Sequence, residues 1–183
     1  MRYLVSETPF TIWLTGLSGS GKTTLAKQLH KFFIDNGCAA CVVDGDALRR
    51  GLCSDLTFSL EHRSENVRRA AEVASILNNA GVIAIVALIS PLVLDRKSAC
   101  NVITADSFAE IYMSASLDVC ELRDVKGLYE KARRNEICDF TGVSSPYERP
   151  ANPLVEIDTS VLSVSESVDI VISALRRNFN GVQ

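Results

Sequence analysis

The sequence predicts an α/β fold, a doubly wound domain with a mostly parallel, five-stranded sheet and helices on both faces. Three observations support this prediction. Strand-like apolar runs alternate with helix-like segments along the 183 residues. The run Val82–Ile89 has no polar alternation, which is typical of a central parallel strand covered on both faces. A glycine-rich loop at 16–21 joins the first expected strand to the first expected helix.

The elements follow from apolar spacing and from stop signals. The first strand is expected at 10–14, and the first helix runs from about Gly21 until Asp35-Asn36-Gly37 stops it. The remaining elements, in order, are a strand at 39–43, an irregular connection at 48–59, a helix at 61–79, the strand at 82–89, a helix around 95–101, a strand at 109–113, a helix at 116–122, a strand at 154–158 and a last helix that begins at the capping box Ser163–Glu166.

Residues 123–153 have a different character. Gly, Ser and Pro crowd their second half, and their core-forming periodicity is weak. Basic residues crowd the first half: Arg123, Lys126, Lys131, Arg133 and Arg134. We interpret this segment as a mobile lid within a single domain of residues 1–183, with a solvated charged helix as the alternative.

Composition excludes several classes of function. The net charge of −3 and the pI near 5.4 argue against a broad nucleic-acid-binding face. No segment approaches the roughly 20 apolar residues of a membrane span, and the start lacks a signal-peptide core, so a cytoplasmic protein is expected. Cys38-Ala-Ala-Cys41 has no second pair to complete a zinc set, which favours reduced thiols over a redox pair among the six cysteines.

The glycine-rich loop matches G-x-x-x-x-G-K-[ST], the phosphate-binding P-loop, at Gly16, Gly21, Lys22 and Thr23. Its backbone N–H groups and the following helix N-terminus attract anions, Lys22 reaches the β- and γ-phosphates, and the Thr23 hydroxyl suits Mg²⁺. The strand, loop and helix stand in the required order, which predicts a nucleoside triphosphate site. The residues expected to bind ATP are Gly16, Leu17, Ser18, Gly19, Ser20, Gly21, Lys22, Thr23 and Thr24.

Other strand ends should add to this site, because ligands bind beyond the carboxyl ends of the strands in such sheets. Asp44 and Asp46 follow the second strand, and Ser90 follows the third. We expect Asp46 to orient or deprotonate an attacking hydroxyl and, with Thr23, to hold the metal. Asp44 either supports it or merely caps the turn. The compact size and basic lid favour a small-molecule kinase over a GTPase, since Asn-Lys-x-Asp is missing.

Further motifs are specific to the acceptor. They are, in chain order, Asp44-Gly45-Asp46, Arg49-Arg50-Gly51-Leu52, residues 55–59 with Phe58, Arg63, residues 65–69 with Asn66, Ile89-Ser90-Pro91, residues 126–129, Phe140-Thr141-Gly142 and Pro146-Tyr147-Glu148. With them the chain closely resembles, over about residues 10–158, the adenylylsulfate kinase family, which phosphorylates adenosine 5′-phosphosulfate (APS) on its ribose 3′-hydroxyl. The resemblance implies a P-loop kinase fold, Mg²⁺-ATP as donor, APS as acceptor and a homodimer.

The resemblance also implies residue roles. Arg49, Arg63 and Asn66 fall where the family binds the phosphosulfate, and Phe58 and Phe140 where it sandwiches the adenine. The spacing agrees, because Arg63 and Asn66 are neighbours on one helix face and guanidinium groups suit a doubly anionic ligand. The expected APS-binding residues are Asp44, Arg49, Phe58, Arg63, Asn66, Ile89, Ser90, Lys126, Leu128 and Phe140.

Ser90 matches the family position assigned to a phosphoserine intermediate and is, with Lys22 and Asp46, a predicted catalytic residue. No base adjoins it in the sequence, which favours direct in-line transfer. The chain also departs from the family pattern: Leu92-Val93-Leu94 replaces a Tyr-Arg pair, Val125 replaces a proline, and Cys138-Asp139 replaces Lys-Gly.

Three readings of the sequence therefore stay open. They are an APS kinase, another small-molecule kinase of the same fold, and a nucleotide-binding module without turnover. The set Arg49, Phe58, Arg63 and Asn66 favours the first reading over the second, and Lys22, Thr23 and Asp46 favour it over the third.

Overall fold

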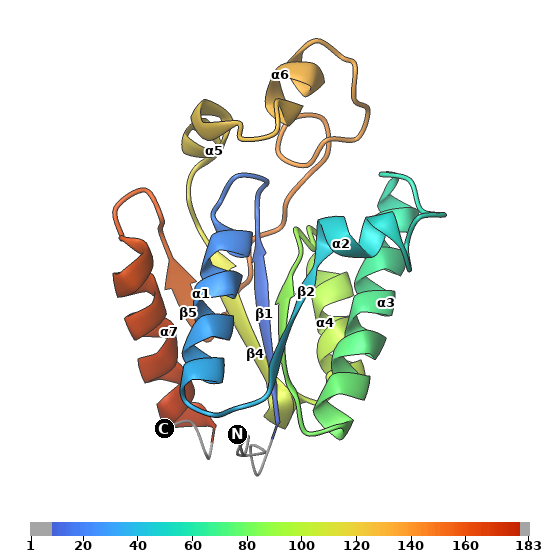
Figure 1. Ribbon diagram of the computed structural model, residues 1–183. Helices are drawn as coiled ribbons and strands as arrows, with labels where there is room; N and C mark the ends of the chain where they lie inside the picture. The colour runs from blue at the N-terminus through green and yellow to red at the C-terminus, as the bar shows by residue number, and fades with distance from the viewer. Residues whose placement is uncertain (1–8, 180–183) are drawn as a thin grey trace.

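The computed structural model describes residues 9–179. Its centre is a five-stranded sheet in the order β2-β3-β1-β4-β5 (Figure 1). The strands are β1 Thr11–Gly16, β2 Ala40–Asp44, β3 Ile83–Ala87, β4 Phe108–Met113 and β5 Val155–Ile157. Each neighbouring pair is parallel, so the sheet that was predicted to be mostly parallel is entirely parallel in the described part of the chain.

Helices cover both faces of the sheet. On one face lie α1 (Lys22–Asp35) and α7 (Val164–Asn178), and on the other lie α3 (Leu60–Asn79) and α4 (Val93–Ile103) (Figure 1). The short helices are α2 Gly45–Arg50, the 3₁₀ turn η1 Ala105–Ser107, α5 Leu117–Arg123 and α6 Leu128–Arg133. No helix within residues 9–179 combines the length and apolarity needed to cross a bilayer.

The central strand β1 explains the two-sided core. Successive side chains of a strand point to opposite faces, so Ile12 and Leu14 pack under α1 and α7 while Trp13 packs under α3 and α4. All six residues of β1 are buried, as the covered faces demand. This packing fixes the strand whose carboxyl end carries the glycine-rich loop.

Helix α2 was not predicted, and helix α4 begins earlier than predicted. The prediction of an irregular connection at 48–59 is wrong for its first part, because α2 continues to Arg50. The Asp44 carboxylate caps the start of this helix by accepting from the amides of Asp46 and Ala47. Helix α4 begins at Val93, before the expected residue 95. Its first amide donates to Glu148 Oε2 at 2.7 Å, and a cap from a residue so distant in sequence leaves no local signal. The predicted capping box of α7 is confirmed.

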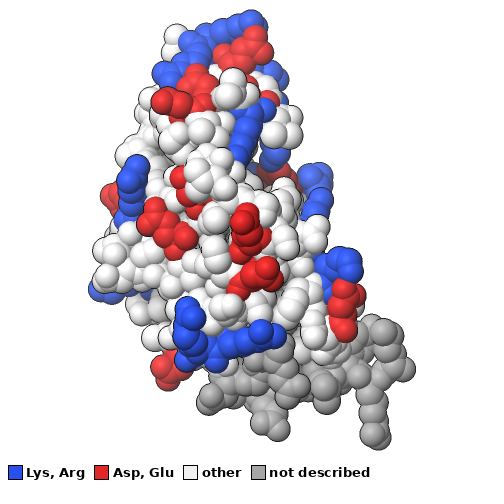
Figure 2. All heavy atoms as spheres, turned by 90° about the vertical axis from the view of Figure 1, so that its left-hand side faces the viewer, with Lys and Arg blue, Asp and Glu red and all other residues white. Residues whose placement is uncertain are grey.

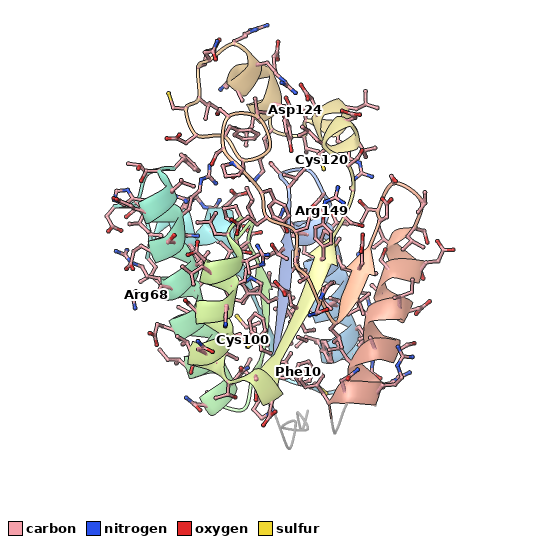
Figure 3. The ribbon with its side chains drawn as sticks, turned by 180° about the vertical axis from the view of Figure 1, so that it is seen from behind. Phe10, Arg68, Cys100, Cys120, Asp124 and Arg149 are labelled. Atoms are coloured by element: carbon pink, nitrogen blue, oxygen red, sulfur yellow. The ribbon has the colours of Figure 1, made fainter. Side chains whose placement is uncertain are left out.

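The lid, which contains α6, and the preceding helix α5 lie above the carboxyl edge of the sheet (Figure 1). Together they have a small core of their own, in which Cys120, Tyr129, Ala132 and Phe140 are buried and Leu17 of the P-loop packs against them. The expectation of weak core formation at 123–153 is therefore wrong for this part. Acidic and basic side chains are interleaved on the outer surface at the lid end of the molecule (Figure 2). Cys120 and Asp124 lie at this end, and Phe10 lies at the opposite end (Figure 3).

Candidate active site

A cavity of about 1240 Å³ lies at the carboxyl edge of the sheet, bounded by the strand ends and the lid. It brings together residues that the sequence analysis took from separate motifs. The predicted residues that line it are Ser18, Gly19, Gly21, Lys22, Thr23, Thr24, Asp44, Asp46, Arg49, Phe58, Arg63, Asn66, Ile89, Ser90, Lys126, Leu128 and Phe140. Gly16, Leu17 and Ser20 lie outside this lining; Ser20 is fully buried and Leu17 packs against the lid core.

The loop takes a backbone conformation that requires glycine. Gly16, Gly19 and Gly21 all have positive φ. A side chain at Gly16 is also impossible on space grounds, because its Cβ would lie 2.5 Å from the carbonyl oxygen of Met113. Helix α1 then begins at Lys22 without a side-chain cap, so its first N–H groups are left for an anion.

Side-chain donors hold each carbonyl of the loop from Gly16 to Ser20. Lys22 Nζ donates to the oxygens of Gly16 at 2.9 Å and Leu17 at 2.6 Å. The oxygens of Ser18, Gly19 and Ser20 accept, in that order, from Tyr129 at 2.9 Å, Arg123 at 3.1 Å and Thr159 at 3.0 Å. The Gly16 and Ser20 amides donate to the oxygens of Ile89 at 3.5 Å and Leu17 at 3.2 Å. The amides of Ser18, Gly19 and Gly21 have no partner within residues 9–179, so they remain available to an anion, as in an anion-binding nest.

Lys22 is the cation of this loop, and only 9 % of it is exposed. Burial lowers the pKa of Lys22 to about 8, an effect reinforced by the nearby Lys126 and opposed by Asp46 and Asp44. A phosphate group beside Lys22 would favour the charged ammonium again. The site is therefore electrostatically incomplete without a polyanion.

A carboxylate lies next to the Thr23 hydroxyl, and it belongs to Asp44. Thr23 Oγ1 donates to Asp44 Oδ2 at 2.9 Å, while the other oxygen of Asp44 caps α2. The capping interpretation of Asp44 is therefore correct, and the same side chain also bonds the loop residue Thr23. Its support of Asp46 in the reaction stays a prediction. Asp46, the other predicted metal ligand, is instead ion-paired with the lid residue Lys126.

Two arginines and an asparagine form the opposite side of the cavity. Arg63 is buried, and its Nε and Nη2 donate to the carbonyl oxygens of Phe58 at 2.8 Å and Asp139 at 2.9 Å. Burial lowers the pKa of Arg63 to about 10, with a further contribution from the positive charge of Arg49. Asn66 lies one helical turn further, and its buried Oδ1 has no hydrogen-bond partner within residues 9–179. Such a group needs a donor from a ligand or from water.

The two predicted aromatic residues differ in their surroundings. Phe58 is 51 % exposed, and the guanidinium carbons of Arg49 and Arg63 lie 4.4 and 5.4 Å from its ring centroid. Phe140 is buried in the lid core, edge-on to Tyr129 with ring centroids 5.0 Å apart. Because Arg63 bonds the residue before Phe140, the lid wall and the α3 wall are joined at this point.

Ser90 sits at the end of β3 with a left-handed φ of 41°. Its buried Oγ accepts from Trp13 Nε1 at 3.1 Å and donates to the oxygen of Leu88 at 3.4 Å. Among the described residues no carboxylate or imidazole is hydrogen-bonded to it. Buried Arg96 fixes the Ser90 carbonyl from behind, and the same guanidinium bonds Glu110 and the backbone of Glu148. A general base for Ser90 is thus lacking at this site in the described chain.

Residues 8–158 match the family model described as Adenylylsulphate kinase. The chain belongs to this family. The adenylyl-sulfate kinase of Prochlorococcus marinus is 52 % identical over 164 residues, which are 90 % of this chain and 82 % of that protein.

Solved structures of the family agree. The Mycobacterium tuberculosis APS kinase CysC in complex with AMPPNP and APS aligns with a TM-score of 0.88 at 44 % identity, covering 92 % of this chain and 98 % of that one. A hexameric APS kinase from Thiobacillus denitrificans aligns with a TM-score of 0.71 at 33 % identity, covering 94 % of this chain and 30 % of that one. The predicted adenylylsulfate kinase resemblance and P-loop kinase fold are thus confirmed.

Three residues that shape the adenylylsulphate kinase site were not predicted as site residues: Arg123, Tyr129 and Thr159. Thr159 follows β5, and the rule that places ligands at carboxyl strand ends was sufficient to find it. Arg123 and Tyr129 hold loop carbonyls from the lid, and no spacing in the sequence connects them with the loop. The departures from the family pattern are also visible: Leu94 is 72 % exposed, and Cys138 and Asp139 line the cavity.

Proposed function

We propose that this chain transfers the γ-phosphoryl group of ATP to the ribose 3′-hydroxyl of APS, giving 3′-phosphoadenosine 5′-phosphosulfate and ADP. A bond forms between the 3′-oxygen and the γ-phosphorus, the bond from that phosphorus to the β,γ-bridging oxygen breaks, and the hydroxyl proton is released. The observation that supports the proposal best is that the P-loop and the pocket of Arg49, Phe58, Arg63 and Asn66 line one cavity.

On the donor side, the loop amides and the start of α1 bind the phosphates, and Lys22 moves from the loop carbonyls to the transferred group. The donor set fits Mg²⁺, because the Thr23 hydroxyl and the Asp44 carboxylate are adjacent hard oxygens. Asp44 takes this place instead of the predicted ligand Asp46, which is paired with Lys126. Residues 9–179 hold no cluster of three acidic, His or Cys side chains, as expected for an ion held chiefly by phosphates and water. When bound, Mg²⁺ neutralises charge developing on the phosphate oxygens.

On the acceptor side, Arg49 and Arg63 donate to the phosphosulfate, and so does the amide N–H of Asn66. The Asn66 Oδ1, which has no partner within residues 9–179, accepts from a hydroxyl or N–H group of APS instead. Phe58 and Phe140 hold the adenine between the α3 side and the lid. Ile89 and Leu128 add apolar contact near Ser90 and Lys126. These assignments follow the family resemblance and are supported by the position of every one of these residues on the cavity wall.

Transfer is direct in this proposal. Asp46 orients the 3′-hydroxyl, and its ion pair with Lys126 ties the lid to the β2 end next to the reacting atoms. Ser90 positions the acceptor through its backbone and hydroxyl, because it has no base to make it a nucleophile. The lid excludes water, which would otherwise compete as the acceptor.

The test is an ADP-release assay with a panel of acceptors that includes APS, a sugar, a shikimate-like acid and a nucleoside monophosphate. APS alone should support rapid ADP release. Turnover with one of the other acceptors but not with APS would select the second reading, and binding without turnover the third. Acid quenching with labelled ATP should leave no label on Ser90; retained label would contradict direct transfer.

We further propose that the chain is one domain of residues 1–183 with its lid at 123–153 and acts as a cytoplasmic homodimer. The six free thiols suit a reducing compartment. The mass in solution, measured by light scattering after size exclusion, should be twice 19.9 kDa. A monomer or a hexamer, the state of the Thiobacillus denitrificans relative, would contradict the dimer.

A further inference from the structure

Tyr129 is a lid residue that contacts both halves of the site. It lies in α6, only 1 % exposed, and its hydroxyl donates to the Ser18 carbonyl of the P-loop at 2.9 Å. The edge of its ring system meets Phe140, with centroids 5.0 Å apart and ring planes at 79°. Neither contact belongs to the reaction described above, because Tyr129 was assigned no role in it.

We propose that Tyr129 is a positioning residue that sets the P-loop for the nucleotide and links this loop to the Phe140 wall of the acceptor pocket. The proposal rests on the proposed function, since it takes the two walls as the sites of nucleotide and APS. It adds an energetic connection between these two sites.

The first step concerns one peptide group. In a trans peptide the carbonyl oxygen and the next amide hydrogen point in opposite directions. When Tyr129 holds the Ser18 oxygen on the lid side, the Gly19 N–H must point the other way. Gly19 lines the cavity, so this amide is directed at the place where the phosphates are expected. Gly19 has a φ of 77°, so few residues other than glycine would retain this plane.

The second step concerns the donor itself. Burial raises the pKa of the Tyr129 hydroxyl well above its usual range, so the phenol stays protonated and keeps donating across the physiological range. The Ser18 oxygen has no other donor among the described residues. Removing the hydroxyl therefore leaves this peptide free to rotate, and the amide loses its direction.

The third step concerns the acceptor side. Phe140 packs edge-on against Tyr129 inside the lid core, and Arg63 bonds the backbone of Asp139 directly before it. A base that stacks on Phe140 restricts this ring, and the restricted ring restricts Tyr129 in turn. When APS has already ordered Phe140 and Tyr129, the nucleotide does not have to order them again, so each ligand should increase the affinity for the other.

The experiment measures binding without turnover. ADP has no γ-phosphoryl group to transfer, so its Kd can be measured by calorimetry with and without saturating APS. Tyr129→Phe keeps the ring and its contact with Phe140 but removes the hydroxyl. Loss of one hydrogen bond should raise the Kd of ADP about three- to tenfold. The decrease in the Kd of ADP that saturating APS causes in wild-type protein should largely disappear in Tyr129→Phe.

The matched control is Tyr112→Phe on β4, which also removes one hydroxyl from a largely buried tyrosine. It should leave both quantities within about twofold of wild type. Values for Tyr129→Phe that equal wild type in both quantities overturn the proposal. Wild-type protein that binds APS without any change in ADP affinity overturns the coupling. If wild-type protein binds no APS, the proposed function is wrong. The Kd of ADP measured without APS then still tests the role of Tyr129 at the loop.

A second measurement covers a variant that does not fold. In wild-type protein, APS alone should slow hydrogen exchange at the amides of Ser18 and Gly19. Unchanged exchange at these amides, with APS bound, overturns the connection. The two measurements together separate a positioning role from a contribution to stability, because stability alone moves neither the ADP affinity nor its response to APS.

Discussion

Asp44 performs two tasks with two oxygens, and a pair of substitutions can separate them. Its Oδ1 accepts from the amides of Asp46 at 2.9 Å and Ala47 at 3.3 Å, while Oδ2 accepts from Thr23 at 2.9 Å. Asp44→Asn keeps a side-chain oxygen for the cap and loses the charge. Asp44→Ala loses both.

The magnitudes differ accordingly. Losing the cap should cost about 1 kcal/mol, which for a chain of this size lowers Tm by roughly 2–4 °C. Asn and Asp cap helices about equally well, so Asp44→Asn should keep the wild-type Tm. A hydrogen bond to a charged group is worth about 1.5–3 kcal/mol, so both variants should lose about 10- to 150-fold in turnover.

Thermal unfolding measures the first quantity, and ADP release at a series of Mg²⁺ concentrations measures the second. Both variants should need more Mg²⁺, because the charged oxygen beside Thr23 is gone. If Asp44→Asn keeps wild-type turnover and an unchanged Mg²⁺ requirement, Asp44 is a helix cap and nothing more.

Three further outcomes are expected. Because burial lowers the pKa of Lys22 to about 8, below its usual value of 10.5, the unfolded chain binds more protons between these values and the free energy of unfolding should rise with pH there. ADP binding near pH 8.5 should then be accompanied by proton uptake, which calorimetry in buffers of different ionisation enthalpy measures. The variant Lys22→Arg should show no proton uptake. If wild-type protein takes up no protons when it binds ADP, the argument is refuted. Arg63→Lys keeps the positive charge but loses the two parallel N–H donors of the guanidinium group, so the KM for APS should rise about tenfold or more while the KM for ATP stays constant. An unchanged KM for APS would contradict the assignment of Arg63 to APS binding. Arg96→Met leaves Glu110 unpaired and should cost about 3–5 kcal/mol in urea unfolding, against less than about 1 kcal/mol for the exposed control Arg68→Met; similar losses would contradict the role of burial.

The parts of the site that sequence reasoning found are those with local spacing. Lys22 and Thr23 belong to one contiguous motif, and Arg63 and Asn66 stand three apart on α3, so their positions followed from helix and loop geometry. The existence and approximate position of the strands followed from apolar runs because both faces of the sheet are covered, although their ends differ by one or two residues from the prediction.

The parts that it missed depend on contacts between distant segments. Glu148 caps α4 from the far end of the lid, and Tyr129 reaches Ser18 across more than a hundred residues. No periodicity connects such pairs, because their proximity arises from the packing of the lid. The lid core escaped notice for a related reason. Tyr129 lies in the short helix α6, which has too few turns to show an apolar stripe, and Phe140 lies in no helix or strand.

The five loop carbonyls have a consequence for the order in which the protein is made. Their donors come from positions 22, 123, 129 and 159, so the cradle is complete only after most of the polypeptide has left the ribosome. Although the glycine motif is translated first, a nascent chain that ends before Thr159 should grip nucleotide weakly. Tight nucleotide binding would then occur late in biosynthesis, after β5 has joined the sheet.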